Sequence, residues 1–264
     1  MTPLGLFDKK LLFIIVVFAL ILIIISLFLA NFELNSESFQ ITNKYAVIKI
    51  KDYNLDWNKL ASLIIEKSSK YEHIIVLVQE NYLSIISSAL SYMLVNINIP
   101  IIVTDKLSYG IKAIKNKILP YDITMTYGDE LFKGSTTYIY NDVMKGQPIE
   151  PRQPNYNDNM YAKFVDPDIR ITIVPSSPNL DLLKTCDGEA LILNVSDESH
   201  INNNLIEQLN ELTNKGIPKV LINQTNGDLF IPSFKMTNDA AYAKLAVLMS
   251  NLKNKNFIES AFGE

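Results

Sequence analysis

The chain has 264 residues, 48% of them apolar, which is enough for one large or two modest domains with hydrophobic cores and excludes a disordered chain. The net charge is −4 and no basic block occurs, so the charge pattern of a nucleic-acid-binding protein is missing. The single cysteine, Cys186, excludes a disulfide framework, and two histidines leave little for metal ligation. We therefore expect no cofactor, no metal and no nucleic acid partner.

Residues 11–30, LLFIIVVFALILIIISLFLA, carry no charge. At about 1.5 Å per residue, a helix of this length crosses a hydrocarbon core of about 30 Å, so we predict one transmembrane helix. A cleaved signal peptide is the alternative, but its apolar core would have about 7–15 residues, and Phe28 and Ala30 make a poor cleavage site. Because Lys9 and Lys10 precede the span, residues 1–10 are predicted to be cytosolic and the C-terminal part extracytoplasmic or lumenal.

After a polar tether at residues 31–43, strands and amphipathic helices alternate. Residues 45–50 indicate a strand, and residues 57–70 a helix with one apolar face. Residues 73–78 and 100–103 are short runs rich in Ile and Val, which favour two buried strands. Between these strands apolar residues recur at steps of three and four and form one face of a helix: Leu83, Ile86, Ala89, Leu90, Met93 and Leu94.

This strand–helix–strand unit predicts a Rossmann-like α/β domain. A crossover joining two fully apolar strands implies parallel pairing with a right-handed connection, in a sheet covered on both faces. Ligands of such sheets lie at the carboxyl ends of the strands. Those ends carry Glu80, Asn81 and Tyr82 after the first strand, and Thr104, Asp105 and Lys106 after the second.

The helix and second strand of this unit, SSALSYML at residues 87–94 and PIIVT at residues 100–104, resemble the central stretch of the L-asparaginase family. In that family a strand leads into a His-Gly-Thr-Asp-Thr motif, then a helix of the type TASALSFML and a strand of the type KPVILTG follow. The catalytic motif is not matched, because its place holds VQENY at residues 78–82. The resemblance thus implies a retained scaffold without the catalytic Thr-Asp pair.

Other segments carry the same resemblance and further losses. The segment from DITMTY at residues 122–127 through LFKG at residues 131–134 is similar to the family's VYFNDKLLRG, and MTNDAAYAKL at residues 236–245 is similar to its DMTPEAALTKL. The family's entry strand, Thr-Gly-Gly-Thr-Ile, contains the nucleophile and has no counterpart in this sequence. The family's catalytic Lys falls on Tyr138, and its Gly-Ala-Gly-Asn on residues 197–200, DESH.

The C-terminal part indicates a second α/β domain. Residues 151–168 are rich in Pro, Asn and Asp, which is typical of a linker. Strands are predicted at residues 169–174, 189–195 and 219–222, with helices at about 179–185 and 203–215, and Thr237 as the N-cap of a final helix. We predict a truncated asparaginase-like N-terminal domain at residues 44–150 and a smaller asparaginase-like C-terminal domain at residues 169–264.

The altered catalytic positions favour an inactive, membrane-anchored protein with a binding or structural role, because losing one member of a catalytic unit can remove most of the catalysis. Two alternatives stay open: an active amidohydrolase with a rearranged or inter-subunit site, and a sensor that binds asparagine, glutamine or aspartate. The family resemblance also implies a homo-oligomer; another protein partner is the alternative.

Two sets of candidate site residues follow. The degenerate site positions are Glu80, Asn81, Tyr82 and Tyr138, where the two tyrosines would tend to fill the old pocket. A relocated catalytic site would use Thr104, Asp105 and Lys106, which include the residue types of the lost set. Neighbours on a strand point to opposite faces, so Thr104 and Asp105 would converge only if the strand ends there.

Overall fold

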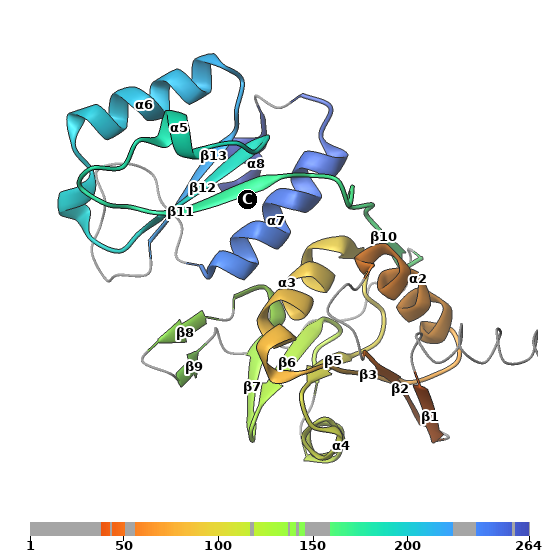
Figure 1. The fold of residues 1–264 in the computed structure, drawn as a ribbon. Coiled ribbons are helices and arrows are strands. Elements are labelled where there is room, and N and C mark those ends of the chain that lie inside the picture. The colour runs from red at the N-terminus through yellow and green to blue at the C-terminus, as the bar shows by residue number, and fades with distance from the viewer. Residues whose placement is uncertain are drawn as a thin grey trace, which may run out of the picture.

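The computed structural model describes residues 38–42, 44–50, 56–116, 119–136, 138–140, 143–145, 159–223, 236–254 and 257–263 (Figure 1). The predicted transmembrane helix at residues 11–30 lies outside these ranges. Within them, the helices are all too short or too polar to cross a bilayer.

The N-terminal unit is built on a six-stranded mixed sheet in the order β1-β2-β3-β5-β6-β7. Its four central strands are parallel: β2 (Tyr45–Lys49), β3 (His73–Leu77), β5 (Ile101–Thr104) and β6 (Ile123–Tyr127). The edge strands β1 (Ser38–Thr42) and β7 (Glu130–Lys133) pair antiparallel with their neighbours. The predicted α/β class and parallel pairing are confirmed.

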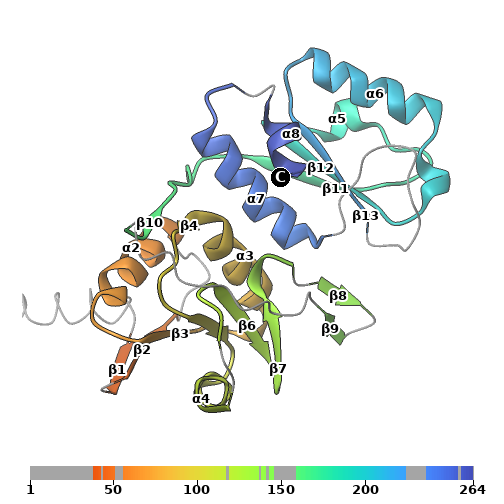
Figure 2. The same cartoon turned by 180° about the vertical axis from the view of Figure 1, so that it is seen from behind.

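Helices cover both faces of this sheet (Figures 1 and 2). Ile74 and Val103 share one core with α2 (Trp57–Ser68) and α3 (Leu83–Met93). Ile75 faces the other way, toward α4 (Leu107–Asn116). Along the chain, β2, β3, β5 and β6 follow one another toward the same edge of the sheet. Because α4 lies on the opposite face from α2 and α3, the crossover through α4 has the opposite hand to the crossovers through α2 and α3. The rule that such crossovers are right-handed in about 98% of cases is therefore broken within this sheet.

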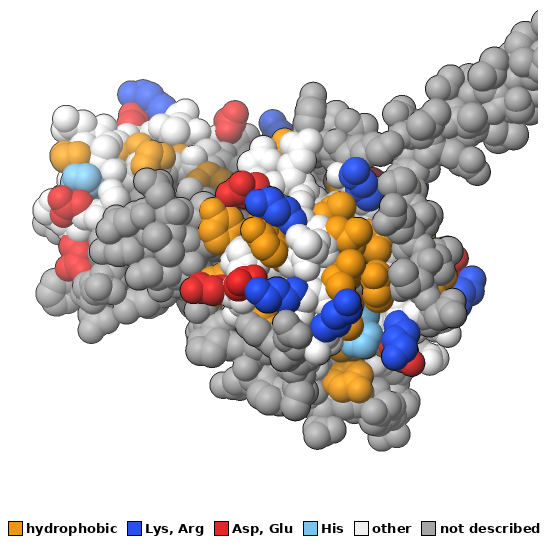
Figure 3. All heavy atoms as spheres, turned by 90° about the horizontal axis from the view of Figure 1, so that it is seen from below, with side chains coloured by type: hydrophobic (Ala, Val, Ile, Leu, Met, Phe, Trp, Pro, Cys, Tyr) orange, Lys and Arg blue, Asp and Glu red, His pale blue; other side chains and the backbone are white. Residues whose placement is uncertain are grey.

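The α4 face carries a mixture of side chains. Seen from below, apolar side chains lie between charged ones (Figure 3). Lys112 of α4 forms an ion pair with Asp129, with Nζ and Oδ2 2.7 Å apart, and both side chains are more than half exposed. Pairs at such exposure contribute only about 0–1 kcal/mol, so the packing of the apolar residues beneath α4 matters more for stability.

Local sequence explains how α3 and its neighbours fit together. Ser87 Oγ donates a hydrogen bond to the Leu83 carbonyl (2.6 Å), so this buried hydroxyl is satisfied within the helix. Gly134 opens the turn η2 (Gly134–Thr136) directly against α3. A Cβ there would lie 2.7 Å from Ser91 Oγ and 2.8 Å from Ile123 Cγ2, which explains why glycine stands at this position.

The C-terminal unit contains a three-stranded parallel sheet, β11 (Ile171–Pro175), β12 (Ala190–Val195) and β13 (Lys219–Asn223). A leucine-rich core lies between one face and the helices α5 (Leu182–Thr185) and α6 (Asn203–Asn214). The other face packs against α7 (Asn238–Asn251) and α8 (Ile258–Gly263). The smaller elements are β4 (Leu94–Val95), which pairs with β10 (Tyr161–Ala162), the hairpin β8 (Tyr138–Tyr140) with β9 (Val143–Lys145), and the 3-10 turns η1 (Glu80–Tyr82) and η3 (Glu198–His200).

Two segments predicted to lack regular structure contain strands. Residues 38–42, at the end of the predicted tether, form β1 because SFQIT finds a long partner edge in β2. Residues 161–162, in the predicted linker, form β10 against β4. Residues 38–42 do alternate polar and apolar residues, but they are a short run within a polar segment, and residues 161–162 are only two residues long, so in both cases the strand is recognised from its pairing partner.

Helix α7 belongs to both cores and joins the two units (Figures 1 and 2). Leu245 packs in the core beneath the C-terminal sheet, whereas Ala246 and Val247 belong to the core of the N-terminal unit. Thr237 caps the helix by accepting a hydrogen bond from the Ala240 amide at 3.0 Å, as predicted. Because α7 is apolar on two sides, separating the units would expose buried surface.

We expect stability to fall in mild acid through His73, at the start of β3. Burial lowers the pKa of His73 below its ordinary value of 6.5, against the opposing charge of Glu72. As the pH falls, His73 is protonated in the unfolded chain before it is protonated in the folded protein. The contribution of neutral His73 to the free energy of unfolding is therefore fully present above pH 6.5 and is lost as the pH falls from 6.5 toward the folded pKa. The melting temperature of His73→Gln should change less between pH 7.5 and pH 5.5 than that of the parent, as measured by circular dichroism. Equal pH slopes would contradict the assignment.

Candidate functional site

Polar side chains gather where β3, β5 and β6 end. Glu80 follows β3 in the 3-10 turn η1, and Tyr127 is the last residue of β6. The Tyr127 hydroxyl donates a hydrogen bond to Glu80 Oε1 at 2.9 Å. This bond and the Glu80 charge raise the pKa of Tyr127 above its ordinary value. The strand-end rule therefore leads to a real cluster, and Tyr127 is a member that the sequence reasoning missed.

Thr104, at the end of β5, is fully buried and its hydroxyl is fully engaged. Its Oγ1 donates to the Lys106 carbonyl at 3.0 Å and accepts from the Thr126 hydroxyl at 2.6 Å and from the Lys106 amide at 3.3 Å. A hydroxyl has one proton to donate, and here a backbone carbonyl, which cannot act as a base, holds it. The geometry is that of a structural threonine at a strand exit.

The Lys106 ammonium is exposed and lies 5.2 Å from the centroid of the Tyr109 ring. A hydrogen bond and charge from Tyr109, followed by the charges of Asp105 and Glu80, raise the pKa of Lys106 above its ordinary value. A lysine used as a general base needs a lowered pKa, so this one is a cation at neutral pH.

Asp105 contributes to this cluster a buried oxygen, Oδ1, which has no hydrogen-bond partner among the residues that the structure describes. A buried polar atom without a partner costs about 1–3 kcal/mol, so such an atom at a strand end is a candidate contact for a ligand. Asp105 lies beside Lys106, and the Thr104 hydroxyl bonds backbone and Thr126 rather than this carboxylate.

The remaining predicted site residues lie apart from this chemistry. Asn81 is exposed, and Tyr82 packs, half-buried, against the N-terminal core. Tyr138 begins β8, and its side chain lies outside the described part of the structure. The expectation that the two tyrosines fill a pocket stays a prediction.

A second polar group occupies the strand ends of the C-terminal unit. Ser176 Oγ lies 3.2 Å from His200 Nδ1, and His200 Nε2 lies 3.9 Å from Asp197 Oδ2. The distance from His200 to Asp197 is too long for a hydrogen bond, and Asp197 Oδ1 instead accepts from the Ser199 amide at 2.8 Å as the cap of η3. Ser176 is only 5% exposed, so this group holds the turn together rather than presenting a nucleophile. Among the described residues, no cluster of His, Cys, Asp and Glu could hold a metal ion.

Comparison with known proteins identifies the fold. No protein-family model and no curated sequence matches this chain. L-asparaginase I from Vibrio cholerae superposes with a TM-score of 0.66 at 18% identity, covering 81% of this chain and 82% of that chain. The chain has the fold of an L-asparaginase. The same coverage is found for the thermostable L-asparaginase from Thermococcus kodakarensis (TM-score 0.63, 17% identity) and a probable cytoplasmic L-asparaginase from Campylobacter jejuni (0.59, 12%).

The asparaginase-like fold that the resemblance in α3 and α7 implied is confirmed. The match covers both units, as expected if residues 87–94 and 236–245 occupy the family's packing positions. Identities of 12–18% establish the fold and carry no statement about chemistry. The function has to be argued from the strand-end residues.

Proposed function

We propose that this is a membrane-anchored, asparaginase-like protein that has a binding or structural role and no amidohydrolase activity. The observation that carries the proposal is the state of Thr104, whose hydroxyl proton is bonded to the Lys106 carbonyl. A threonine nucleophile needs an adjacent base to accept this proton. The neighbouring lysine has a raised pKa, and the Asp105 carboxylate makes no bond to the hydroxyl, so no such base is in place.

The membrane anchor is inferred from the sequence of residues 11–30, which supports a single span with the two units on the far side of the membrane from the N-terminus. Strand β1 begins at Ser38, so at most seven residues separate it from the proposed span. A chain of that length reaches no more than about 25 Å, which would keep the β1 edge close to the bilayer. A second copy or another protein is the proposed partner.

A specific observation favours a second candidate, an amino-acid sensor. Asp105, whose Oδ1 has no partner among the described residues, and Lys106, whose ammonium is exposed, are consecutive residues directly after β5. Free asparagine, glutamine or aspartate carries an ammonium and a carboxylate, which are complementary to these two groups. Binding would give Asp105 the partner that the protein itself does not supply.

The assay is ammonia release by the full-length chain in a neutral detergent, with asparagine or glutamine as substrate. We expect no release above the buffer control, because the Thr104 hydroxyl, the candidate nucleophile at the described strand ends, has no base beside it. Turnover that disappears in Thr104→Ala would overturn the proposal in favour of the rearranged active site. Turnover that survives this substitution would place an active site elsewhere.

The same preparations separate the sensor from the purely structural role. A rise in melting temperature with asparagine, glutamine or aspartate that is lost in Lys106→Met and kept in Lys115→Met would support the sensor. Lys115 lies on α4, exposed and away from the strand ends, so it serves as the matched control. An unchanged melting temperature with all three amino acids would contradict the sensor and favour the structural role.

A further inference from the structure

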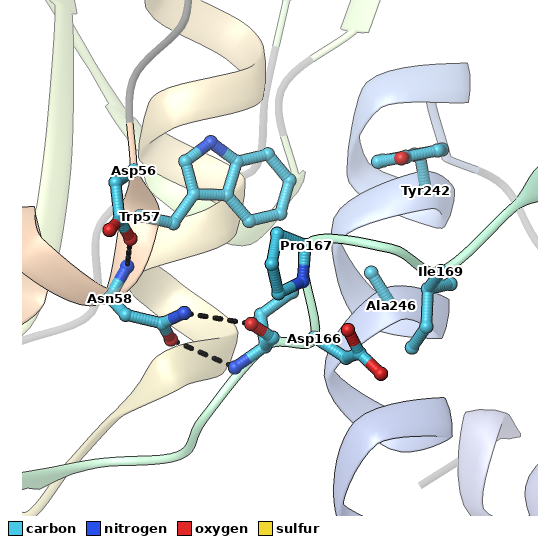
Figure 4. Close-up of a pocket in the computed structure, with 9 residues that line it drawn as sticks. Asp56, Trp57, Asn58, Asp166, Pro167, Ile169, Tyr242 and Ala246 are labelled. Carbon is cyan, nitrogen blue, oxygen red and sulfur yellow. Dashed lines mark hydrogen bonds between the residues drawn. The ribbon is translucent and has the colours of Figure 1, made fainter.

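A pocket of about 510 Å³ lies at the junction of the two units (Figure 4). Three separate segments form its walls. The start of α2 contributes Asp56, Trp57 and Asn58, residues 165–169 of the connection cross its middle, and α7 contributes Tyr242 and Ala246. It is distinct from the strand-end cluster, because none of the residues of that cluster lines it.

Hydrogen bonds hold the walls in place. The Asn58 side chain bonds both backbone groups of Val165, donating from Nδ2 to the carbonyl at 2.7 Å and accepting from the amide at 2.9 Å (Figure 4). On the other side, the Asp166 amide donates to Ser250 Oγ on α7 at 2.9 Å. The connection is therefore tied to both units, and the pocket is formed before any ligand arrives.

The lining combines aromatic and acidic groups. The Trp57 and Tyr242 rings are perpendicular, with centroids 6.2 Å apart. Asp56 and Asp166 add two carboxylates, and the lining residues that the structure describes include no basic side chain. The bonds recorded for these two carboxylates use Oδ1: in Asp56 it caps α2, and in Asp166 it accepts from the Asp168 amide at 3.0 Å. Figure 4 shows the Asp166 side chain between the connection and α7.

We propose that this pocket binds a small organic ammonium ion. The two carboxylates of the described lining repel an anionic ligand and attract a cationic one. The faces of Trp and Tyr rings attract alkylammonium groups, and Val165, Pro167 and Ile169 supply an apolar wall for the carbon part of the ligand. Because the ligand would contact α2, the connection and α7 together, binding would also stabilise the arrangement of the two units.

The test uses the chain's own reporter, since Trp57 is its single tryptophan. Choline and benzyltrimethylammonium are titrated into the full-length protein in a neutral detergent, and Trp57 emission is recorded. We expect a saturable change with at least one of the two cations. The neutral analogue of choline, 3,3-dimethylbutan-1-ol, should bind at least about tenfold more weakly, because it lacks the charge that the carboxylates and rings recognise.

Two variants with the same change of charge locate the site. Asp166→Asn keeps the Oδ1 contact to the Asp168 amide and should weaken binding of the cation at least about tenfold. Asp168→Asn removes an equal charge two residues away, outside the lining, and should bind as the parent does. The proposal is overturned by the absence of a saturable response to both cations, by equal affinity for choline and its neutral analogue, or by parental affinity in Asp166→Asn.

Discussion

Replacing Phe262 by alanine should lower the free energy of unfolding by about 3–5 kcal/mol. Phe262 is 1% exposed and is among the largest fully buried side chains of the protein. It projects from α8 into the core that also contains Leu245 of α7 and Ile192 of β12. The ammonium of Lys244 lies 5.2 Å from its ring centroid and donates a hydrogen bond to its carbonyl at 2.6 Å. Truncation would remove the ring from this core and from Lys244 and leave a cavity, whereas the backbone carbonyl that accepts from Lys244 would remain.

The matched control is Phe257→Ala. Phe257 directly precedes α8 and is 61% exposed, so the same chemical change should alter stability by no more than about 0.5 kcal/mol. Unfolding of both variants in urea would be followed by circular dichroism for the whole chain and by Trp57 emission for the N-terminal unit. If α7 couples the two units, Phe262→Ala should lower both midpoints. Equal losses in the two variants would contradict the packing of α8.

Removing residues 1–37 should move the protein from the membrane fraction to the soluble fraction almost completely. Leu, Ile, Phe and Val favour the bilayer by about 0.3–0.6 kcal/mol each, so residues 11–30 contribute roughly 5–10 kcal/mol in favour of insertion. Such a free energy corresponds to a partition ratio of more than about 10³. Carbonate extraction of membranes followed by immunoblotting measures the distribution.

Substitutions at the centre of the span provide the controls. Leu20→Arg with Ile21→Arg should greatly weaken anchoring, because each arginine costs about 2.5–3.5 kcal/mol there. Leu20→Val with Ile21→Val keeps the apolar character and should remain in the membrane fraction. An N-terminal tag that is lost from the mature protein would instead establish a cleaved signal peptide. A tagged, full-length protein in the soluble fraction would refute the anchor.

Much of the N-terminal fold could be predicted from local pattern. The apolar runs at residues 73–78 and 100–103 became β3 and β5, and the three-and-four spacing from Leu83 to Met93 became α3. Such patterns work because burial of one face or of both faces imposes a period on the residues of one element. Strand β1 was missed although SFQIT alternates polar and apolar residues, because this five-residue run lies in a polar segment that was interpreted as a tether; its pairing with β2 identifies it as a strand.

The candidate site could be predicted only in part from the sequence. Strand ends pointed to Glu80 and to Thr104, Asp105 and Lys106, since ligands in parallel sheets lie there. The partners from β6 could not be predicted, because Thr126 lies 22 residues after Thr104 and Tyr127 lies 47 residues after Glu80. The Thr104 proton is held locally by the Lys106 carbonyl, and the position of β6 beside β5 adds the Thr126 hydroxyl as a donor to the same oxygen.

The sequence by itself determined the types of the main elements and the resemblance to asparaginases, because both depend on residues within one or two turns of each other. Only the tertiary structure decided which face of the sheet α4 covers, that α7 serves two cores, and that Trp57 and Asp166 meet in one pocket. Residues 57 and 166 are more than a hundred positions apart. Their proximity results from the packing of two units around α7, and no local period in the chain records it.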